Sequence, residues 1–225
     1  MENRMEVIMR QIYSNLANRQ LTIVDDSVSM ISAVLLPLVE INGKCNILFE
    51  VRSKNLNRQP GEICFPGGRV EKCEHPNPLT TALRETSEEL GITEKDIDVI
   101  GPLDILVSPL STMIYPYVGK FKTARILPNP REVEETFLAP VDFFLAEPPY
   151  VTYVEVATRY GPDFPLNKVP PVYKEGWQTR SSFPMYFYEY DKYFIWGLTG
   201  KILFNFLSIC WPEHQVFKKP FKKWK

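Results

Sequence analysis

The sequence has few of the residues on which several common chemistries depend. Its 225 residues include two histidines, His75 and His214, and four cysteines that never form a CxxC pair. This scarcity argues against a zinc site and against a cysteine–histidine catalytic pair, so Cys64 is interpreted as structural rather than nucleophilic. Scattered thiols without a disulfide framework favour a reducing compartment, and we expect a cytoplasmic protein.

Long apolar runs and an excess of one charge are also missing. No segment approaches the ~18 consecutive apolar residues of a membrane span, and the N-terminus lacks the apolar core of a signal peptide. The formal net charge of −1 offers nucleic acid no general attraction. We therefore expect a single domain over 1–225 that binds neither nucleic acid nor membrane, with a homodimer left open.

What the sequence does contain is a glycine turn followed by a carboxylate-rich helix. Gly67-Gly68 precedes Glu85, Glu88 and Glu89, which share one side of a helix because their spacing is i, i+3 and i+4. Like charges packed in this way destabilise a helix, so a compensating cation is inferred, and Mg²⁺ prefers oxygen ligands. A solvated acidic helix is the plainer alternative. The glycine turn and Arg84 favour cation binding and chemistry on phosphates.

The ends of this helix can be read from the sequence. Asn77 is a favourable N-cap, Pro78 suits the first helical position, and Gly91 suits a left-handed C-terminal residue. An apolar stripe is expected to be buried, leaving the glutamates on another face that is open to solvent or substrate. The members of this stripe are Leu79, Ala82, Leu83, Thr86 and Leu90.

These residues resemble the Nudix box, G-x5-E-x7-R-E-U-x-E-E-x-G-U, in which U is a bulky apolar residue. Gly68-x5-Glu74 matches the first half, and Arg84 to Ile92 matches the second. The spacer between the halves holds nine residues rather than seven, which predicts a longer loop, and Thr86 replaces an apolar residue. The resemblance implies an α+β fold, a Nudix-like α/β/α sandwich around a mixed sheet, and hydrolysis of a diphosphate.

The same resemblance implies roles for single residues. Glu85, Glu88 and Glu89 would bind Mg²⁺, or Mn²⁺ as a substitute, with help from the Gly67 carbonyl. Glu85 would combine the roles of ligand and general base. Arg84 would orient the carboxylates through charge-assisted hydrogen bonds.

A second resemblance narrows the substrate. Residues 48–68 look like the extended signature of coenzyme A diphosphatases, although Phe49 replaces a leucine and Gln59 stands where histidine is common. Ile195–Gly200 is similar to the I-W-G-x-T-A segment of this group. The implied substrate is coenzyme A or a thioester, cleaved to 3′,5′-ADP and 4′-phosphopantetheine. The implied substrate-binding residues are Arg52, Ser53, Leu56, Gln59 and Gly68.

Two further acids lie near these motifs. Glu74 is expected to support the loop rather than to touch a metal. Glu132 lies in a segment similar to one of the coenzyme A group and is a candidate accessory acid, with a solvated surface charge as the alternative. Two other functions stay open, a hydrolase of ADP-ribose or another nucleoside diphosphate derivative, and a non-catalytic Nudix-fold domain that senses a nucleotide.

Periodicity predicts the remaining elements. The sequence indicates an N-terminal amphipathic helix over about 2–18, within a segment 1–20, which is expected to pack on the core rather than on a membrane. Strands are expected over 31–41, 45–52, 98–107, 113–121 and 185–193, with an Asn42-Gly43 hairpin turn. Helices are expected over 141–146 and 196–210, whereas 132–137 is ambiguous.

The two remaining segments are harder to interpret. Prolines interrupt residues 148–184, so we expect an irregular excursion, either a lid that approaches the pantetheine end of the substrate or a surface loop without function. Its aromatic residues suit an apolar pocket, or could pin the loop to the core. The basic tail over 212–225 is expected to be frayed and solvated.

Overall fold

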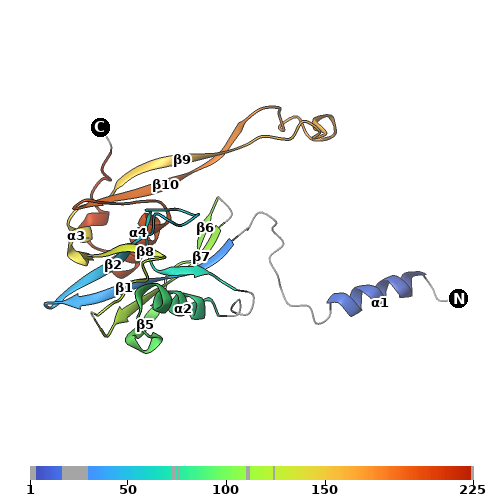
Figure 1. Cartoon of the computed structure of the whole chain (residues 1–225). Helices are drawn as coiled ribbons and strands as arrows, with labels where there is room; N and C mark the ends of the chain where they lie inside the picture. Colours follow the sequence, from blue (N-terminus) through green and yellow to red (C-terminus); the bar gives the residue numbers. More distant parts are fainter. Residues whose placement is uncertain are drawn as a thin grey trace.

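A mixed β-sheet with helices on both faces forms the body of the protein (Figure 1). The structure, a computed structural model, describes residues 4–16, 30–71, 74, 77–109, 112–123 and 125–223. The strands of the sheet are β1 (Met30–Ile41), β2 (Lys44–Arg52), β3 (Ile63–Cys64), β4 (Gly67–Arg69), β5 (Ile97–Pro102), β6 (Leu106–Ser108), β7 (Thr112–Phe121) and β8 (Val133–Pro140).

The parallel pair β1 and β7 lies at the centre of the sheet, and every other pairing in it is antiparallel. β1 turns into β2 through Asn42 and Gly43, whose φ angles of 51° and 74° are those that a tight hairpin turn requires. β1 is apolar on both sides, with Leu35 and Leu36 both fully buried. This double burial is expected for a strand that is covered by helices on each face.

Each face of the sheet has its own core. The helix α2 (Pro78–Leu90) packs with Ala33, Leu35 and Leu48 on one face. The helices α3 (Val141–Ala146) and α4 (Gly197–Cys210) pack with Leu36 and Phe49 on the other. This arrangement confirms the predicted α/β/α sandwich.

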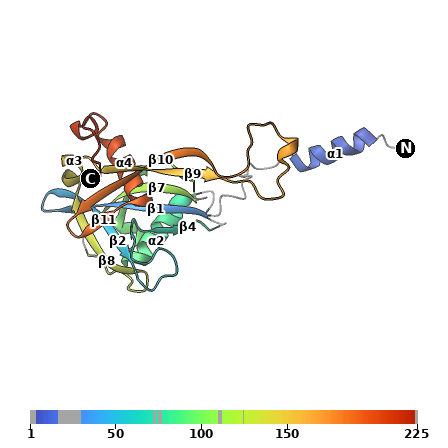
Figure 2. The ribbon, with the colours of Figure 1, turned by 90° about the horizontal axis from the view of Figure 1, so that it is seen from above.

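The N-terminal helix α1 (Arg4–Leu16) stands apart from the body in both views (Figures 1 and 2). Its apolar side chains are exposed, for example Met5 by 62% and Tyr13 by 66%. The expectation that this helix packs on the core is therefore wrong for the side chains that the structure describes. Within the described part of the chain, no helix is long and apolar enough to cross a membrane.

In the body, the structure corrects one expected strand and resolves one segment that the sequence left ambiguous. The predicted strand over 98–107 is two strands, β5 and β6, which both pair with β7 and are separated at Leu103–Ile105. Asp104 leaves the ladder there because its backbone N–H and its carboxylate bind the Asn205 side chain on α4. The ambiguous segment at 132–137 belongs to β8, and a short 3-10 helix, η1 (Glu94–Asp96), follows α2.

Residues 148–184 are not an irregular excursion. They contain β9 (Tyr150–Thr158) and most of β10 (Gln178–Tyr190), which pair as a long antiparallel hairpin, and β11 (Tyr193–Ile195) completes this second sheet. The hairpin runs beyond the body in both views (Figures 1 and 2). We call residues 150–190 the arm and residues 159–177, which include the short helix η2 (Leu166–Lys168), its tip.

The basic tail, as far as residue 223, is also more ordered than expected. After the 3-10 helix η3 (Gln215–Phe217), the chain returns to the base of the arm, where Val151 N–H donates to Lys222 O. Phe221 packs against Tyr186 and Phe204. These contacts replace the frayed end that the sequence predicted, and they fasten the arm to α4.

Candidate active site

The glycine turn sits directly on the central strand of the sheet. Gly67 pairs with Val34, and Leu35 N–H donates to Pro66 O at 2.9 Å. Gly67 has a φ of +150°, and a Cβ at this position would collide with Ala33 O. Only glycine combines this backbone conformation with so close an approach to β1.

Helix α2 presses its carboxylates against this turn. A Cβ on Gly68 would collide with the Glu85 carboxylate, and Gly67 N–H donates to Glu89 Oε2 at 2.8 Å. Glu85 and Glu89 are one helical turn apart and therefore face successive residues of the turn. The turn and the helix thus form one unit, as the motif spacing predicted.

The limits of α2 follow the sequence signals with one difference. Pro78 occupies the first turn, and Gly91 ends the helix in the left-handed region with φ 62°. Asn77 lies at the N-cap position, but its side chain makes no capping hydrogen bond. Instead, the Thr81 hydroxyl donates to Glu74 Oε2 at 2.8 Å, which ties the first turn of the helix to the preceding loop.

The expectation that all three glutamates share an open face is wrong for Glu89. Glu89 is only 4% exposed, whereas the Glu88 side chain is 57% exposed. Glu89 follows the buried Ala82 by seven residues and therefore lies on nearly the same side of the helix. Of the predicted stripe, Ala82, Thr86 and Leu90 are fully buried, and the Thr86 hydroxyl donates to Ala82 O, whereas Leu79 and Leu83 are only half-buried.

Arg84 links the acidic residues of both halves of the motif. Its guanidinium lies 3.1 Å from Glu74 Oε1, 2.8 Å from Glu85 Oε1 and 3.3 Å from Glu88 Oε2. The bond to Arg84 lowers the pKa of Glu74 to about 2. Glu74 also accepts from Glu71 N–H, so in the structure it supports the loop and anchors the arginine.

Burial makes two carboxylates of α2 hard to ionise. It raises the pKa of Glu89 to about 9, with the charge on Glu50 as the next cause. It also raises the pKa of Glu85, although the neighbouring Arg84 opposes this shift. Buried carboxylates with raised pKa values are typical of functional sites.

Glu50 is the residue of this site that the sequence analysis missed. It lies on β2, is 1% exposed, and accepts a hydrogen bond from Cys64 Sγ at 3.1 Å. A visible signal was a glutamate within the apolar run 47–51, where strand alternation puts it on the same face as Leu48 and Arg52. Because Leu48 packs in the core beneath α2, Glu50 points toward that helix.

A loop after β7 brings Glu132 to the same place. Leu127 N–H donates to Leu90 O, and Asn129 N–H donates to Glu89 O, so the loop is fastened to the C-terminal turn of α2. Glu132 O accepts from Ser53 N–H at 2.8 Å. The charge of Glu132 contributes to the raised pKa values of Glu50, Glu85 and Glu89.

Apart from Gly68 on β4, the predicted substrate residues lie at the end of β2 and in the connection from β2 to β3. Arg52 is half-buried, and its Nε contacts Arg58 O at 3.4 Å. Ser53 is buried, and its hydroxyl accepts from Asn55 N–H, whereas Gln59 is exposed and binds Glu62. Leu56, half-buried, donates its backbone N–H to Ser53 O. Arg52 and Ser53 lie close to the acidic residues, because the charge of Arg52 opposes the raised pKa of Glu50 and Ser53 N–H donates to Glu132 O.

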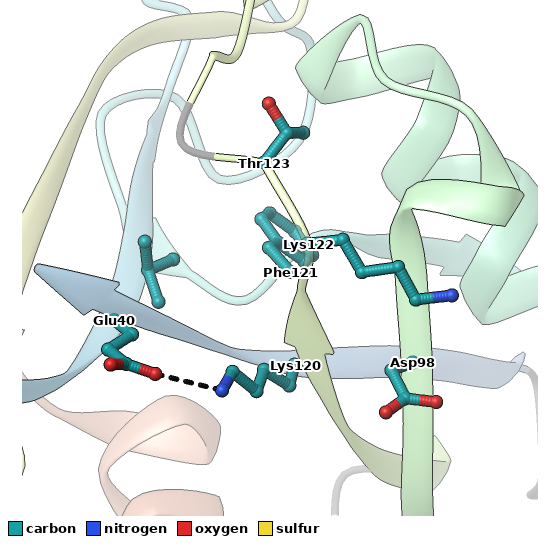
Figure 3. A pocket seen from close by; sticks show the side chains of 7 residues that line it. Glu40, Asp98, Lys120, Phe121, Lys122 and Thr123 are labelled. Carbon is teal, nitrogen blue, oxygen red and sulfur yellow. Dashed lines mark hydrogen bonds and ion pairs between the residues drawn. The ribbon is translucent and has the colours of Figure 1, made fainter.

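A polar hollow at another edge of the sheet is separate from these carboxylates. Glu40, Asp98, Lys120 and Lys122 line it, and Lys120 Nζ lies 2.9 Å from Glu40 Oε2 (Figure 3). Lys120 pairs with a β1 residue four positions beyond the one that pairs with Gly67, about 13 Å along the strand. The two acidic and two basic side chains that line the hollow balance one another in charge, so the hollow does not resemble a cation site.

Comparison with known proteins agrees with the motifs. The sequence profile of the NUDIX domain matches residues 30–154. The peroxisomal coenzyme A diphosphatase NUDT7 of Mus musculus is 32% identical over 196 residues, which cover 84% of this chain and 74% of that protein. The chain belongs to the Nudix hydrolase family.

Two further matches are weaker, because one covers a smaller share of both proteins and the other has a lower sequence identity. The mitochondrial coenzyme A diphosphatase NUDT8 of Homo sapiens is 35% identical over 118 residues, which cover 51% of this chain and 50% of that protein. Among solved structures, a MutT/nudix family protein from Enterococcus faecalis has a TM-score of 0.49 at 13% identity and covers 96% of this chain and 74% of that one. Membership of the family makes this chain a pyrophosphohydrolase.

The acidic residues of this Nudix site suit a hard divalent cation in chemical type. They supply carboxylate oxygens, and one buried oxygen, Glu50 Oε2, has no hydrogen-bond partner. Among the residues that the structure describes, no three of these side chains already form a cation-binding group. Arg84 engages one oxygen of Glu85 and one of Glu88, so it can hold both carboxylates while their second oxygens bind a cation.

Proposed function

We propose that this Nudix hydrolase cleaves the diphosphate of coenzyme A or an acyl-CoA in a Mg²⁺-dependent reaction, giving 3′,5′-ADP and 4′-phosphopantetheine or its acyl derivative. The observation that carries this proposal is the similarity, over 84% of the chain, to a protein named as a coenzyme A diphosphatase. The signature at residues 48–68 supports it. Mn²⁺ is proposed as a substitute for Mg²⁺.

The geometry suggests how the residues of the chain divide the work. A bound Mg²⁺ would offset the charge of the diphosphate and lower the pKa of an attacking water. Glu85, Glu88 and Glu89 are proposed as its ligands, with the Gly67 carbonyl. Glu85 is also the proposed general base, because it lies against the turn and burial raises its pKa toward the range in which a base is effective.

Other residues of the chain would position the reacting groups. Arg84, held by Glu74, keeps Glu85 and Glu88 oriented. Glu132, fastened to α2 by its loop, is proposed as the accessory acid, and Gly68 leaves room beside Glu85. Ser53, Leu56 and Gln59 are proposed to shape the loop that holds the substrate, with Arg52 contacting a phosphate.

A hollow on the α2 face suits the organic part of the substrate. Its lining is mostly apolar and includes Leu48, which lies two residues before Glu50 on β2. Residues from four segments line it, including Val39, Leu48, Phe121, Ile126 and Leu138. Ligand sites generally combine such an apolar wall with a few polar groups.

The cytoplasmic location of the protein stays a prediction, since the two relatives named above carry peroxisomal and mitochondrial names.

A substrate panel tests the proposal. Initial rates would be measured with coenzyme A, acyl-CoAs, ADP-ribose, NADH and nucleoside triphosphates, each with Mg²⁺ and with EDTA. We expect the highest kcat/KM for a coenzyme A derivative and no turnover in EDTA. A panel in which ADP-ribose is the best substrate would overturn the substrate class alone, whereas full activity in EDTA would overturn the mechanism.

Arg52→Ala sharpens the substrate assignment. Coenzyme A carries a 3′-phosphate that ADP-ribose lacks, and the planar fork of arginine suits phosphate oxygens. We expect the variant to lose more kcat/KM with coenzyme A than with ADP-ribose. Equal losses with both substrates would remove Arg52 from recognition of the 3′-phosphate.

A further inference from the structure

Glu50 carries a carboxylate oxygen for which the fold provides no partner. Among the residues that the structure describes, Glu50 Oε2 and Tyr188 Oη are the buried side-chain oxygens and nitrogens without a hydrogen-bond partner. Glu50 is 1% exposed, and its other oxygen accepts a single hydrogen bond, from the thiol of Cys64. A thiol is a weak donor. A buried polar atom left unsatisfied in this way commonly marks a functional group or an ion that completes it.

The sheet places this carboxylate beside the glycine turn. Glu50 pairs with Cys64 on β3, and Cys64 is three residues before Gly67 in the chain. Side chains of paired residues lie on the same face of a sheet, and here that is the face covered by α2. The Gly67 N–H, in turn, binds Glu89. Glu50 and Glu89 therefore approach the turn from the sheet and from the helix.

In the part of the chain that the structure describes, no lysine or arginine forms an ion pair with Glu50 or Glu89. The guanidinium of Arg84 engages Glu74, Glu85 and Glu88 rather than Glu50 or Glu89. Arg52 acts on Glu50 through its charge, without an ion pair among the described residues. Glu50 and Glu132 act on Glu89 as like charges. Two buried carboxylates that repel one another are destabilising unless protons or a cation compensate them.

We propose that Glu50 is a further cation ligand of this site, so that a divalent cation binds between Glu50 on β2 and Glu89 on α2. This inference rests on the proposed Mg²⁺-dependent function and adds a residue outside the Nudix box to its ligands. Glu50 Oε2 is the oxygen offered to the cation, while Oε1 keeps the bond from Cys64. A ligand on the sheet would hold the cation against the turn, independently of the exposed Glu88.

Cation binding without substrate tests this inference. Mn²⁺ affinity would be measured by electron paramagnetic resonance or calorimetry for the parent, Glu50→Gln and Glu89→Gln. Loss of one charged ligand should raise the Mn²⁺ Kd on the order of tenfold in each variant, because ligand charge sets affinity. Glu94→Gln makes the same change at an exposed glutamate outside the group and should keep the parent Kd.

Thermal unfolding separates a ligand from a merely structural residue. Glu50→Gln removes a buried charge without changing shape, so the Tm in EDTA should rise while the Tm increase on adding Mn²⁺ becomes smaller. Cys64→Ala removes the thiol bond but keeps the carboxylate, and should leave the Mn²⁺ Kd within about twofold of the parent, because the proposed ligand atom is Oε2. If the Glu50–Cys64 bond had only a structural role, Cys64→Ala would instead change the Mn²⁺ Kd more than Glu50→Gln does.

The outcomes distinguish this inference from the function on which it rests. If Glu50→Gln binds Mn²⁺ with the same Kd as the parent while Glu89→Gln has a raised Kd, the role of Glu50 is overturned and the proposed function stays in place. A parent protein that binds no Mn²⁺ and hydrolyses its substrate in EDTA would overturn both. A raised Kd in both variants, with normal binding in Glu94→Gln, would support the inference.

Discussion

The glycine turn and the arm both contain antiparallel strand pairs, but they are held in place very differently. The turn is fastened by β1 below it, by Glu89 above it and by β2 beside it. The arm is fastened at its base, where Tyr186 lies on α4 and the tail crosses Tyr150. Because a two-stranded hairpin alone is marginally stable in water, we expect the stability of the arm to fall from its base toward its tip.

The base of the arm is nevertheless connected to the turn. The Thr199 hydroxyl at the start of α4 donates to Ile63 O on β3, and a Cβ on Gly200 would collide with Tyr186 O on β10. These two residues belong to the segment that resembles the coenzyme A group. These contacts give a physical reason for a threonine at 199 and a small residue at 200, because they join α4 to the arm and to β3, the strand that leads to Gly67.

The largest expected effect is the loss of one carboxylate of the site. Glu88→Gln is nearly isosteric at an exposed position, so it removes charge without disturbing the packing. We expect kcat to fall about 10²–10³-fold, as it does when a group that stabilises the transition state is removed. Glu155→Gln, the same change on the exposed β9 strand of the arm, should leave kcat unchanged. Near-parent activity of Glu88→Gln at low Mg²⁺ would contradict the proposed ligand set.

Gly200→Ala should weaken the attachment of the arm. The added methyl has no room between α4 and β10, and overpacking of this kind costs about 1–3 kcal/mol of unfolding free energy. We expect a Tm lower by several degrees at unchanged kcat per folded molecule, measured by calorimetry and by rates at 25 °C. Gly101→Ala on β5 meets no atoms within 4 Å and, like Gly200, has no positive φ, so it is the matched control and should keep the parent Tm. A drop in kcat for Gly200→Ala at constant Tm would indicate that α4 acts on the site directly.

Stability in EDTA should depend on pH through the buried carboxylates. Their folded-state pKa values, about 7 for Glu50 and about 9 for Glu89, lie above the ordinary value of 4.5, so the native state binds more protons than the unfolded state between those limits. The contribution of these groups is therefore present below about pH 4.5 and is lost as the pH rises toward 9. Urea unfolding at pH 5 to 9 should show this decline, and Glu89→Gln should flatten it. A decline equally steep in Glu89→Gln would assign it to other groups.

The sequence predicted the glycine turn and the helix α2 better than the arm, because these elements and the arm depend on contacts of different range. The i, i+3, i+4 spacing of Glu85, Glu88 and Glu89 is a local property of one helix, and a glycine turn is equally local. Glu50 was missed because its position in the site depends on pairing with Cys64 and on a helix that follows much later in the chain. Strand periodicity could have placed it on the α2 face, but not beside Glu89.

The arm was missed because its prolines look like strand breakers. Most of them lie outside its strands, since Pro148 and Pro149 precede β9, and Pro162 to Pro171 lie in the tip. Pro184 does lie within β10, opposite Tyr153, in a two-stranded segment where a missing N–H can face away from the ladder. Whether such prolines break a strand depends on which side of it pairs, and the sequence alone does not contain that information.

The smallest expected effect concerns the tip. Its aromatic side chains pack on one another, with Tyr160 and Phe164 rings 4.3 Å apart and Tyr160 and Tyr173 rings 6.0 Å apart. Arg159 covers Trp177. This clustering replaces the expectation that these aromatics pin a loop to the core. Replacing residues 160–176 by a short Gly/Ser turn should therefore leave the protein folded, with a Tm close to that of the parent.

The kinetics of this trimmed protein decide whether the arm recognises substrate. The base of the arm adjoins β3 through Thr199, so a long substrate bound at the turn could extend along it. We expect a severalfold higher KM for coenzyme A and an unchanged KM for a short diphosphate, because only the long substrate would reach beyond the turn. Unchanged KM values for both would leave the tip without a role in recognition. Unfolding of the trimmed protein would instead show that the tip stabilises the arm, and would reverse the contrast between the two regions.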